Sequence, residues 1–109
     1  MANTFNNEAI TSVGTTPTAL YATDANTKAT VIGINVANLL QETVTCDIIF
    51  ENALSQAFFI VKGAVIPQGS SLAAIGGDQK LALNGNNRIL INANTPNAID
   101  AIISVLEIS

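Results

Sequence analysis

Carboxylates are the side chains in this sequence that come nearest to a catalytic pattern. Asp47 and Glu51 lie four residues apart in ETVTCDIIFE, a segment that alternates polar and apolar residues as a β-strand does. At about 3.3 Å per strand residue, this spacing separates the two by about 13 Å. Cooperating carboxyl groups in glycoside hydrolases lie only about 5 to 9.5 Å apart. We therefore interpret both as solvent-facing residues on the outer face of a strand.

Other groups that could do chemistry are scarce. The chain has no histidine, which removes the most frequent general base and metal ligand. The segment GGDQK, residues 76–80, sets one Asp beside one Lys, which is too few oxygen ligands for calcium and more typical of a turn. No nucleophile or phosphate-loop motif occurs. We expect no catalytic residue, no metal site and no cofactor, and hence no enzyme.

Cys46 is the single cysteine, so the chain has no internal disulfide. Its place among the apolar positions of VTCDIIF indicates a small buried hydrophobe. The amino end, MANTFNNEAITS, lacks the charged and apolar stretches of a signal peptide. No run reaches the about 18 apolar residues that a membrane helix needs. We expect a protein made in the cytoplasm and without a membrane partner.

The surface is polar but carries little charge. Charged residues make up 11% of the 109 residues, against about 25% in an ordinary soluble domain. The four cations are scattered and the aromatic residues are few, so nucleic acid would find neither neutralising charge nor stacking platforms. Asn, Thr, Ser, Gln and Gly replace the charge. Such a surface suits packed assemblies, in which neighbouring copies meet without charge repulsion.

Short apolar segments, separated by turn residues about every ten positions, predict an all-β fold. We expect a single antiparallel β-sandwich, jelly-roll or Ig-like, with about eight short strands in residues 13–109. Residues 1–12 show no sustained period. We interpret them as an extended N-terminal arm that the fold does not need and that holds a partner through Phe5 and Ile10.

Two segments predict the orientation of particular residues. In ATVIGINVAN the alternation places Ile32, Ile34 and Val36 on the core face. In AFFIVKGAVIP the Lys62–Gly63 pair and Pro67 indicate an edge strand, bent at the glycine and ending at the proline.

The last segment, AIDAIISVLEIS, is apolar on both faces of the strand that it predicts. We expect the face with Ile99, Ala101, Ile103 and Val105 to point into the core. One sheet covers one face, so the other needs the arm or a neighbouring subunit, unless loops or edges of the sandwich cover it. AFFIVKGAVI has the same two-sided character. We expect a homo-oligomer whose interface includes Phe5, Ile10, Phe59, Val61, Ile102, Leu106 and Ile108.

From residue 18 onward the chain carries a series of short motifs, at Leu20-Tyr21, Asn38, Lys62-Gly63, Ile66-Pro67, Gly69, Leu81, Leu83, Gly85, Asp100, Ser104 and Leu106-Glu107-Ile108. In their order and spacing these motifs resemble those of a small β-sandwich domain of tailed-bacteriophage virion proteins. One departure is Gly85-Asn86, where the family has Gly-Asp, and it weakens the case for a metal at this turn. The resemblance implies a structural protein of the virion and brings no catalytic residue with it.

We therefore expect a capsid decoration or cement protein that contacts its own copies and other virion proteins. A neck, tail or baseplate accessory protein is the nearest alternative. A ligand- or carbohydrate-binding module that uses the Asn-rich turns is the alternative from another class, although sugar sites favour aromatic platforms and the chain has no Trp.

Overall fold

The computed structural model describes residues 3–76 and 80–108, and this part of the chain forms nine β-strands and no helix. The strands are β1 (Asn3–Val13), β2 (Thr18–Ala22), β3 (Lys28–Asn38), β4 (Val44–Glu51), β5 (Ala57–Ile66), β6 (Ser71–Ile75), β7 (Leu81–Leu83), β8 (Arg88–Ala93) and β9 (Ile99–Ile108). None of the described segments therefore offers a helix that could cross a membrane. Of the GGDQK segment, residues 77–79 lie outside the described residues.

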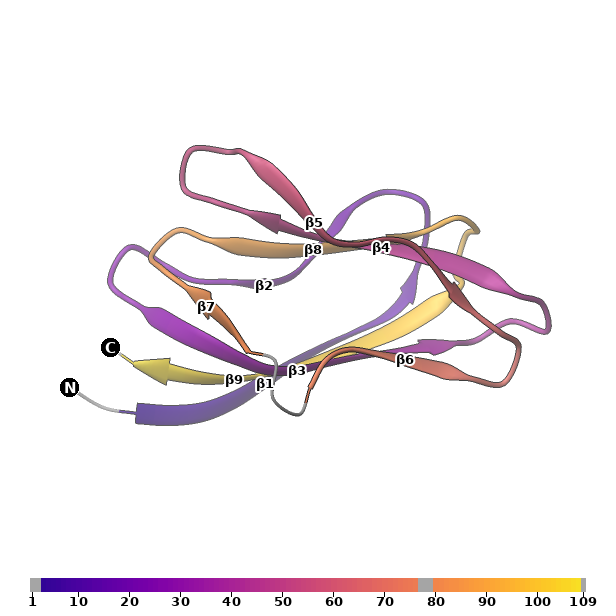
Figure 1. The fold of residues 1–109 in the computed structure, drawn as a ribbon, viewed down its shortest axis with the longest axis horizontal. Helices are drawn as coiled ribbons and strands as arrows, with labels where there is room; N and C mark the ends of the chain where they lie inside the picture. Colours follow the sequence, from indigo (N-terminus) through magenta and orange to yellow (C-terminus); the bar gives the residue numbers. More distant parts are fainter. Residues whose placement is uncertain (1–2, 77–79, 109) are drawn as a thin grey trace.

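The strands form two antiparallel sheets that pack face to face as a β-sandwich (Figure 1). Sheet A has the order β1-β9-β3-β6, with β7 also paired to β3, and sheet B has the order β2-β8-β4-β5. The predicted all-β sandwich is confirmed, with one strand more than the expected eight among the described residues.

The strand order is that of a jelly roll, one of the two expected alternatives. The hairpin β4–β5 is the innermost pair, and β3 with β6 and β7, β2 with β8, and β1 with β9 pair successively outside it. The chain is thus one long hairpin, folded back at β4–β5 and then rolled into two sheets. The first and last strands, β1 and β9, consequently lie side by side in sheet A (Figure 1).

Alternating apolar residues of both sheets fill the core. In β9 the predicted inner face is confirmed, since Ile99, Ala101, Ile103 and Val105 are fully buried. Sheet B supplies the opposite wall from β4 and β8, with Val44, Cys46, Ile48, Ile89 and Ile91.

A β-bulge in β3 overturns part of the predicted core face. The register of β3 against β9 shifts between Val31 and Gly33, so the alternation changes phase there. Val31 lies in the core before the bulge, and Ile34 and Val36 lie in it afterwards. Ile32, predicted to face the core, is absent from the core cluster and lines a shallow recess on the outer face of sheet A.

The predicted bend in β5 is confirmed. Lys62 and Gly63 stand opposite Asp47 alone, and Gly63 adopts a φ of 65°, which suits a residue without a β-carbon. The Gly63 amide donates to Asp47 Oδ1 at 2.7 Å. β5 is the edge strand of sheet B and ends at Ile66, directly before Pro67.

The expectation of an N-terminal arm outside the sandwich is wrong for the residues that the structure describes. β1 pairs with β9 from Asn3 to Ile10, and its pairing resumes at Val13 after an irregularity at which Ser12 has a φ of 55°. Thr11 and the Ser12 amide both donate to Asp100 Oδ1. An edge strand with mainly exposed polar residues shows no apolar alternation, so the sequence of β1 does not identify it as a strand.

Candidate assembly surface

The outer face of sheet A gathers apolar residues from three strands. Ile102, Leu106 and Ile108 lie on the side of β9 that faces away from the core, and Ile102 is 49% exposed. Phe5 of β1 stands directly opposite Leu106 and is 76% exposed. Ile32 borders the same shallow recess as Phe5 and Ser104. We call Phe5, Ile32, Ile102, Leu106 and Ile108 the sheet A face.

Charge on this face is confined to its ends. Lys28 stands opposite Ile108, and Asp100 lies two residues before Ile102. Asp100 already accepts hydrogen bonds from Thr11 Oγ1 at 2.6 Å and from the Ser12 amide at 3.0 Å. The middle of the face therefore presents apolar side chains between uncharged Asn, Ser and Thr, a composition that costs less hydration free energy to cover than charged side chains would.

The structure divides the seven residues of the expected interface among three environments. Phe5, Ile102, Leu106 and Ile108 belong to the sheet A face. Ile10 and Val61 are partly buried and pack against the core of their own chain. Their part in an interface stays a prediction.

Phe59 lies on the outer face of the other sheet. It pairs across strands with Ile49, which is only 9% exposed although it is not part of the core cluster. Lys62 places its Nζ 4.3 Å from the centre of the Phe59 ring, a cation–π contact. Phe59 is still 52% exposed, but it is separated from the sheet A face by the thickness of the sandwich.

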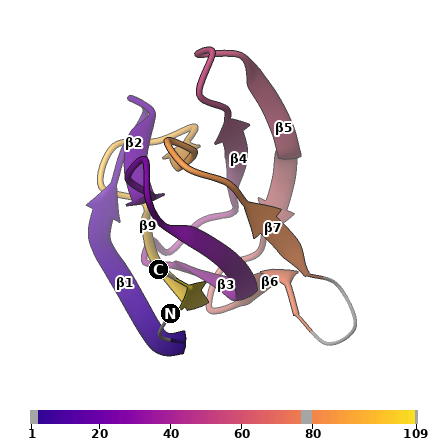
Figure 2. The same ribbon diagram turned by 90° about the vertical axis from the view of Figure 1, so that its left-hand side faces the viewer.

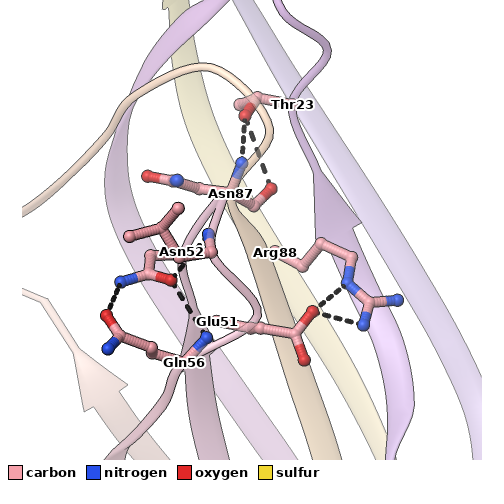
Figure 3. A network of polar contacts seen from close by, with 7 residues as sticks. Thr23, Glu51, Asn52, Gln56, Asn87 and Arg88 are labelled. Atoms are coloured by element: carbon pink, nitrogen blue, oxygen red, sulfur yellow. Dashed lines mark hydrogen bonds and ion pairs between the residues drawn. The ribbon is translucent and has the colours of Figure 1, made fainter.

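Both carboxylates considered for catalysis are engaged in holding strands together. Asp47 accepts from the Gly63 amide and, at 3.3 Å, from Asn92 Nδ2 of the neighbouring strand β8. Glu51 accepts from the Arg88 guanidinium across the same pair of strands (Figure 3). Among the described residues no three Asp, Glu or Cys side chains are grouped so as to hold a metal ion.

Asn side chains in the turns also form hydrogen bonds within the fold. Asn87 is 4% exposed, and its side-chain oxygen accepts from the Asn84 amide. Its backbone amide donates to Thr23 Oγ1 (Figure 3). Asn52 closes the β4–β5 hairpin by accepting from Leu54 and Gln56 (Figure 3). These hydrogen bonds hold the turns and the strands beside them in register.

A recess at the side of the sandwich holds one polar pair that sequence reasoning missed. Between β1 and β2 the Tyr21 hydroxyl donates to Glu107, and Glu8 and Asn6 line the same recess. Burial, followed by the hydrogen bond to Glu107, raises the pKa of Tyr21 well above its ordinary value of 10. The two residues lie 86 positions apart, so no local pattern could have linked them.

Cys46 is 1% exposed, and burial raises its thiol pKa to about 11. A thiol that is buried and protonated is a poor nucleophile and cannot reach a partner's cysteine. The predicted role of Cys46 as a small buried hydrophobe is confirmed.

No protein-family model matches the chain, and no curated protein matches it. Among solved structures, a chain from Bacillus endospore appendages, described as a novel family of disulfide-linked pili, superposes with a TM-score of 0.59 at 14% identity. The match covers 98% of this chain and 88% of that one. At this identity it establishes likeness of fold alone. A chain of infectious bursal disease virus, Gx strain, matches 95% of this chain and 40% of that one at 8% identity, with a TM-score of 0.27 that supports no argument.

Proposed function

We propose that this chain is a non-enzymatic structural subunit of a tailed-bacteriophage virion, made in the host cytoplasm and acting as a capsid decoration or cement protein. The observation that carries the proposal is the sheet A face, on which Phe5 is 76% exposed and Ile102 is 49% exposed. Apolar side chains exposed together on one sheet face are a common feature of interaction sites in soluble proteins.

Burial of the sheet A face provides the binding free energy. Each Å² of apolar surface removed from water contributes about 25 cal/mol, so an interface of several hundred Å² per partner can hold a subunit weakly. A particle presents many equivalent sites, and multivalent attachment turns weak single contacts into stable coverage. A surface with only 11% charged residues also lets neighbouring copies approach closely.

Two further features support the virion setting. Jelly rolls are common in viral capsid proteins, although a fold by itself does not define a function. The motifs shared with phage virion domains extend over nearly the whole chain after residue 18. Disulfide links, which the description of the Bacillus pili names, have no counterpart here because the one cysteine is buried. Attachment in this chain is therefore non-covalent.

The same surface would serve a neck, tail or baseplate accessory protein, and the position of the bound protein on the particle distinguishes these settings. A carbohydrate-binding module is less well supported, because the chain has no Trp for an aromatic platform and the side-chain oxygens of Asn87 and Asn94 accept hydrogen bonds within the fold.

The test uses phage particles produced from the encoding genome after deletion of this gene. Purified wild-type protein is expected to sediment with the particles and to saturate a fixed number of sites. Ile102→Lys and Leu106→Lys each place a charge in the sheet A face and are expected to weaken binding at least about tenfold, since a buried unpaired charge is costly.

Val65→Lys is the matched control, because Val65 is 61% exposed but lies on β5 in the other sheet. It should bind as the wild type does, and all variants should keep the wild-type melting temperature. Failure of the wild type to sediment with particles, or equal binding by the Ile102 and Val65 variants, would overturn the proposal.

A further inference from the structure

The edge strands of this sandwich differ in how they are protected from pairing with other chains. An exposed strand edge presents unpaired amides and carbonyls, which proteins shield with short strands, Lys, Pro or bulges. β2 and β6 have five residues each and β7 has three. β5 is longer, but it carries Lys62 and is bent by the bulge at Gly63.

β1 has none of these protections over most of its length. It is eleven residues long and contains no Lys, Arg or Pro. Its pairing with β9 is continuous from Asn3 to Ile10, and the one irregularity comes after Ile10. Within the described chain no strand other than β9 pairs with it, and it borders the sandwich on one side (Figure 2).

We propose that β1 pairs antiparallel with β1 of a second copy of this chain, so that sheet A continues from one subunit into the next. The only charged residue on β1 is Glu8, so two such edges meet with little repulsion. The proposal deepens the function proposed above and rests on it, since it names the partner with which this structural subunit first assembles.

The side-chain pattern selects one register. Residues that stand directly opposite each other on paired strands have their side chains on the same face of the sheet. A two-fold axis that relates the two β1 strands must therefore lie between one residue and the same residue of the other copy. We place this axis at Asn7. Glu8 then faces Asn6 of the other copy, and Phe5 faces Ala9. Because Ala9 already stands opposite Ile102, the second copy's Phe5 extends the apolar row of the sheet A face. An axis at Asn6 would instead set Phe5 against Asn7, and an axis at Glu8 would oppose two like charges.

A charge-swap experiment tests both the partner and the register. In this register Asn7 of one subunit stands opposite Asn7 of the other. Asn7→Lys and Asn7→Asp therefore each create a like-charged pair at the centre of the interface. Sedimentation equilibrium should find a wild-type dimer and about five-fold or greater weakening in each variant alone. An equimolar mixture of the two variants should restore the dimer, since Lys then faces Asp.

Gln68→Lys and Gln68→Asp serve as controls, because Gln68 is exposed in a turn away from β1 and these variants should dimerise as the wild type does. Asn7 is itself exposed, and unchanged melting curves establish that its variants are folded. A monomeric wild type, an open filament, or a mixture that fails to dimerise would overturn this pairing. If the wild type is monomeric but still binds particles through Ile102, the proposed function stands and only the pairing is refuted. If the dimer forms but does not bind particles, only the proposed function is refuted.

Discussion

Single side chains that could have served chemistry in this protein instead join strands. Asp47 holds the bulge at Gly63, Asp100 holds the end of β1, and Glu107 accepts from the Tyr21 hydroxyl. Several of these residues also belong to the short motifs found in the sequence, among them Tyr21, Gly63 and Asp100. Those motifs therefore encode features of the fold, such as a bulge, a turn and a strand-to-strand hydrogen bond.

Burial of Cys46 should make it resistant to alkylation in the native protein. With a thiol pKa of about 11 instead of 9, the thiolate fraction at pH 8 is lower by about a hundredfold, and access is blocked as well. We expect native protein to react with iodoacetamide at least about a hundredfold more slowly than protein unfolded in urea, as followed by mass spectrometry. Equal rates in the two states would contradict the burial of this residue.

Tyr21 should make the protein less stable at alkaline pH. Its folded-state pKa is raised, so the stabilisation is complete below pH 10 and is lost as the pH rises from 10 towards the folded value. Above pH 10 we expect the free energy of unfolding of the wild type to fall with pH more steeply than that of Tyr21→Phe. The two slopes should differ by up to about 1.4 kcal/mol per pH unit.

Because Tyr21 is the only tyrosine, phenolate absorbance reports it directly. The absorbance should appear near pH 10 in urea and at higher pH in the native protein. At neutral pH Tyr21→Phe should cost about 1.5 kcal/mol, the value of a hydrogen bond to a charged group. Coincident titration curves in the two states would refute this account.

Among the strands, β1 contributes most to the proposed assembly, because it belongs to sheet A and forms the edge of that sheet with the least protection against pairing with another chain. Its outer residues contribute Phe5 to the sheet A face, while Ile10 packs against the core. The strand therefore cannot be a dispensable arm.

Removing residues 1–10 should destabilise the fold. The deletion uncovers the edge of β9 and removes the packing of Ile10, whose burial alone is worth about 1.5 to 3 kcal/mol when complete. We expect a loss of about 2 to 4 kcal/mol by urea denaturation. Ile10→Ala, which keeps the strand, should account for only part of the loss, and an unchanged unfolding midpoint for the truncated chain would contradict the role of β1.

At the scale of the whole molecule, low charge and the apolar residues of the sheet A face predict attachment that depends little on salt. Ionic strength screens interactions between exposed charges and leaves apolar burial nearly unaffected. Particle binding should change less than about two-fold between about 0.05 and about 0.5 M NaCl in a sedimentation assay. A tenfold decrease would point to an electrostatic interface in place of the sheet A face.

The amino-acid sequence alone predicted what depends on neighbours along the chain. Alternation identified the buried face of β9, the Lys62–Gly63 pair identified the bend in β5, and the single cysteine was correctly placed in the core. These features follow from the period of a strand and from the backbone freedom of glycine, both of which can be recognised in a few adjacent residues.

Only the tertiary structure decided which strands meet and which faces they present. The bulge in β3 moved Ile32 out of the core, β9 recruited the polar N-terminal segment as β1, and the rolled hairpin placed Phe59 and Phe5 on opposite sheets. Hydrogen bonds between strands join residues that lie far apart in the chain. Because they connect backbone groups, they do not depend on which side chains the residues carry. Pairing, and with it the assembly surface, therefore depends on which edges remain free once the whole chain has folded.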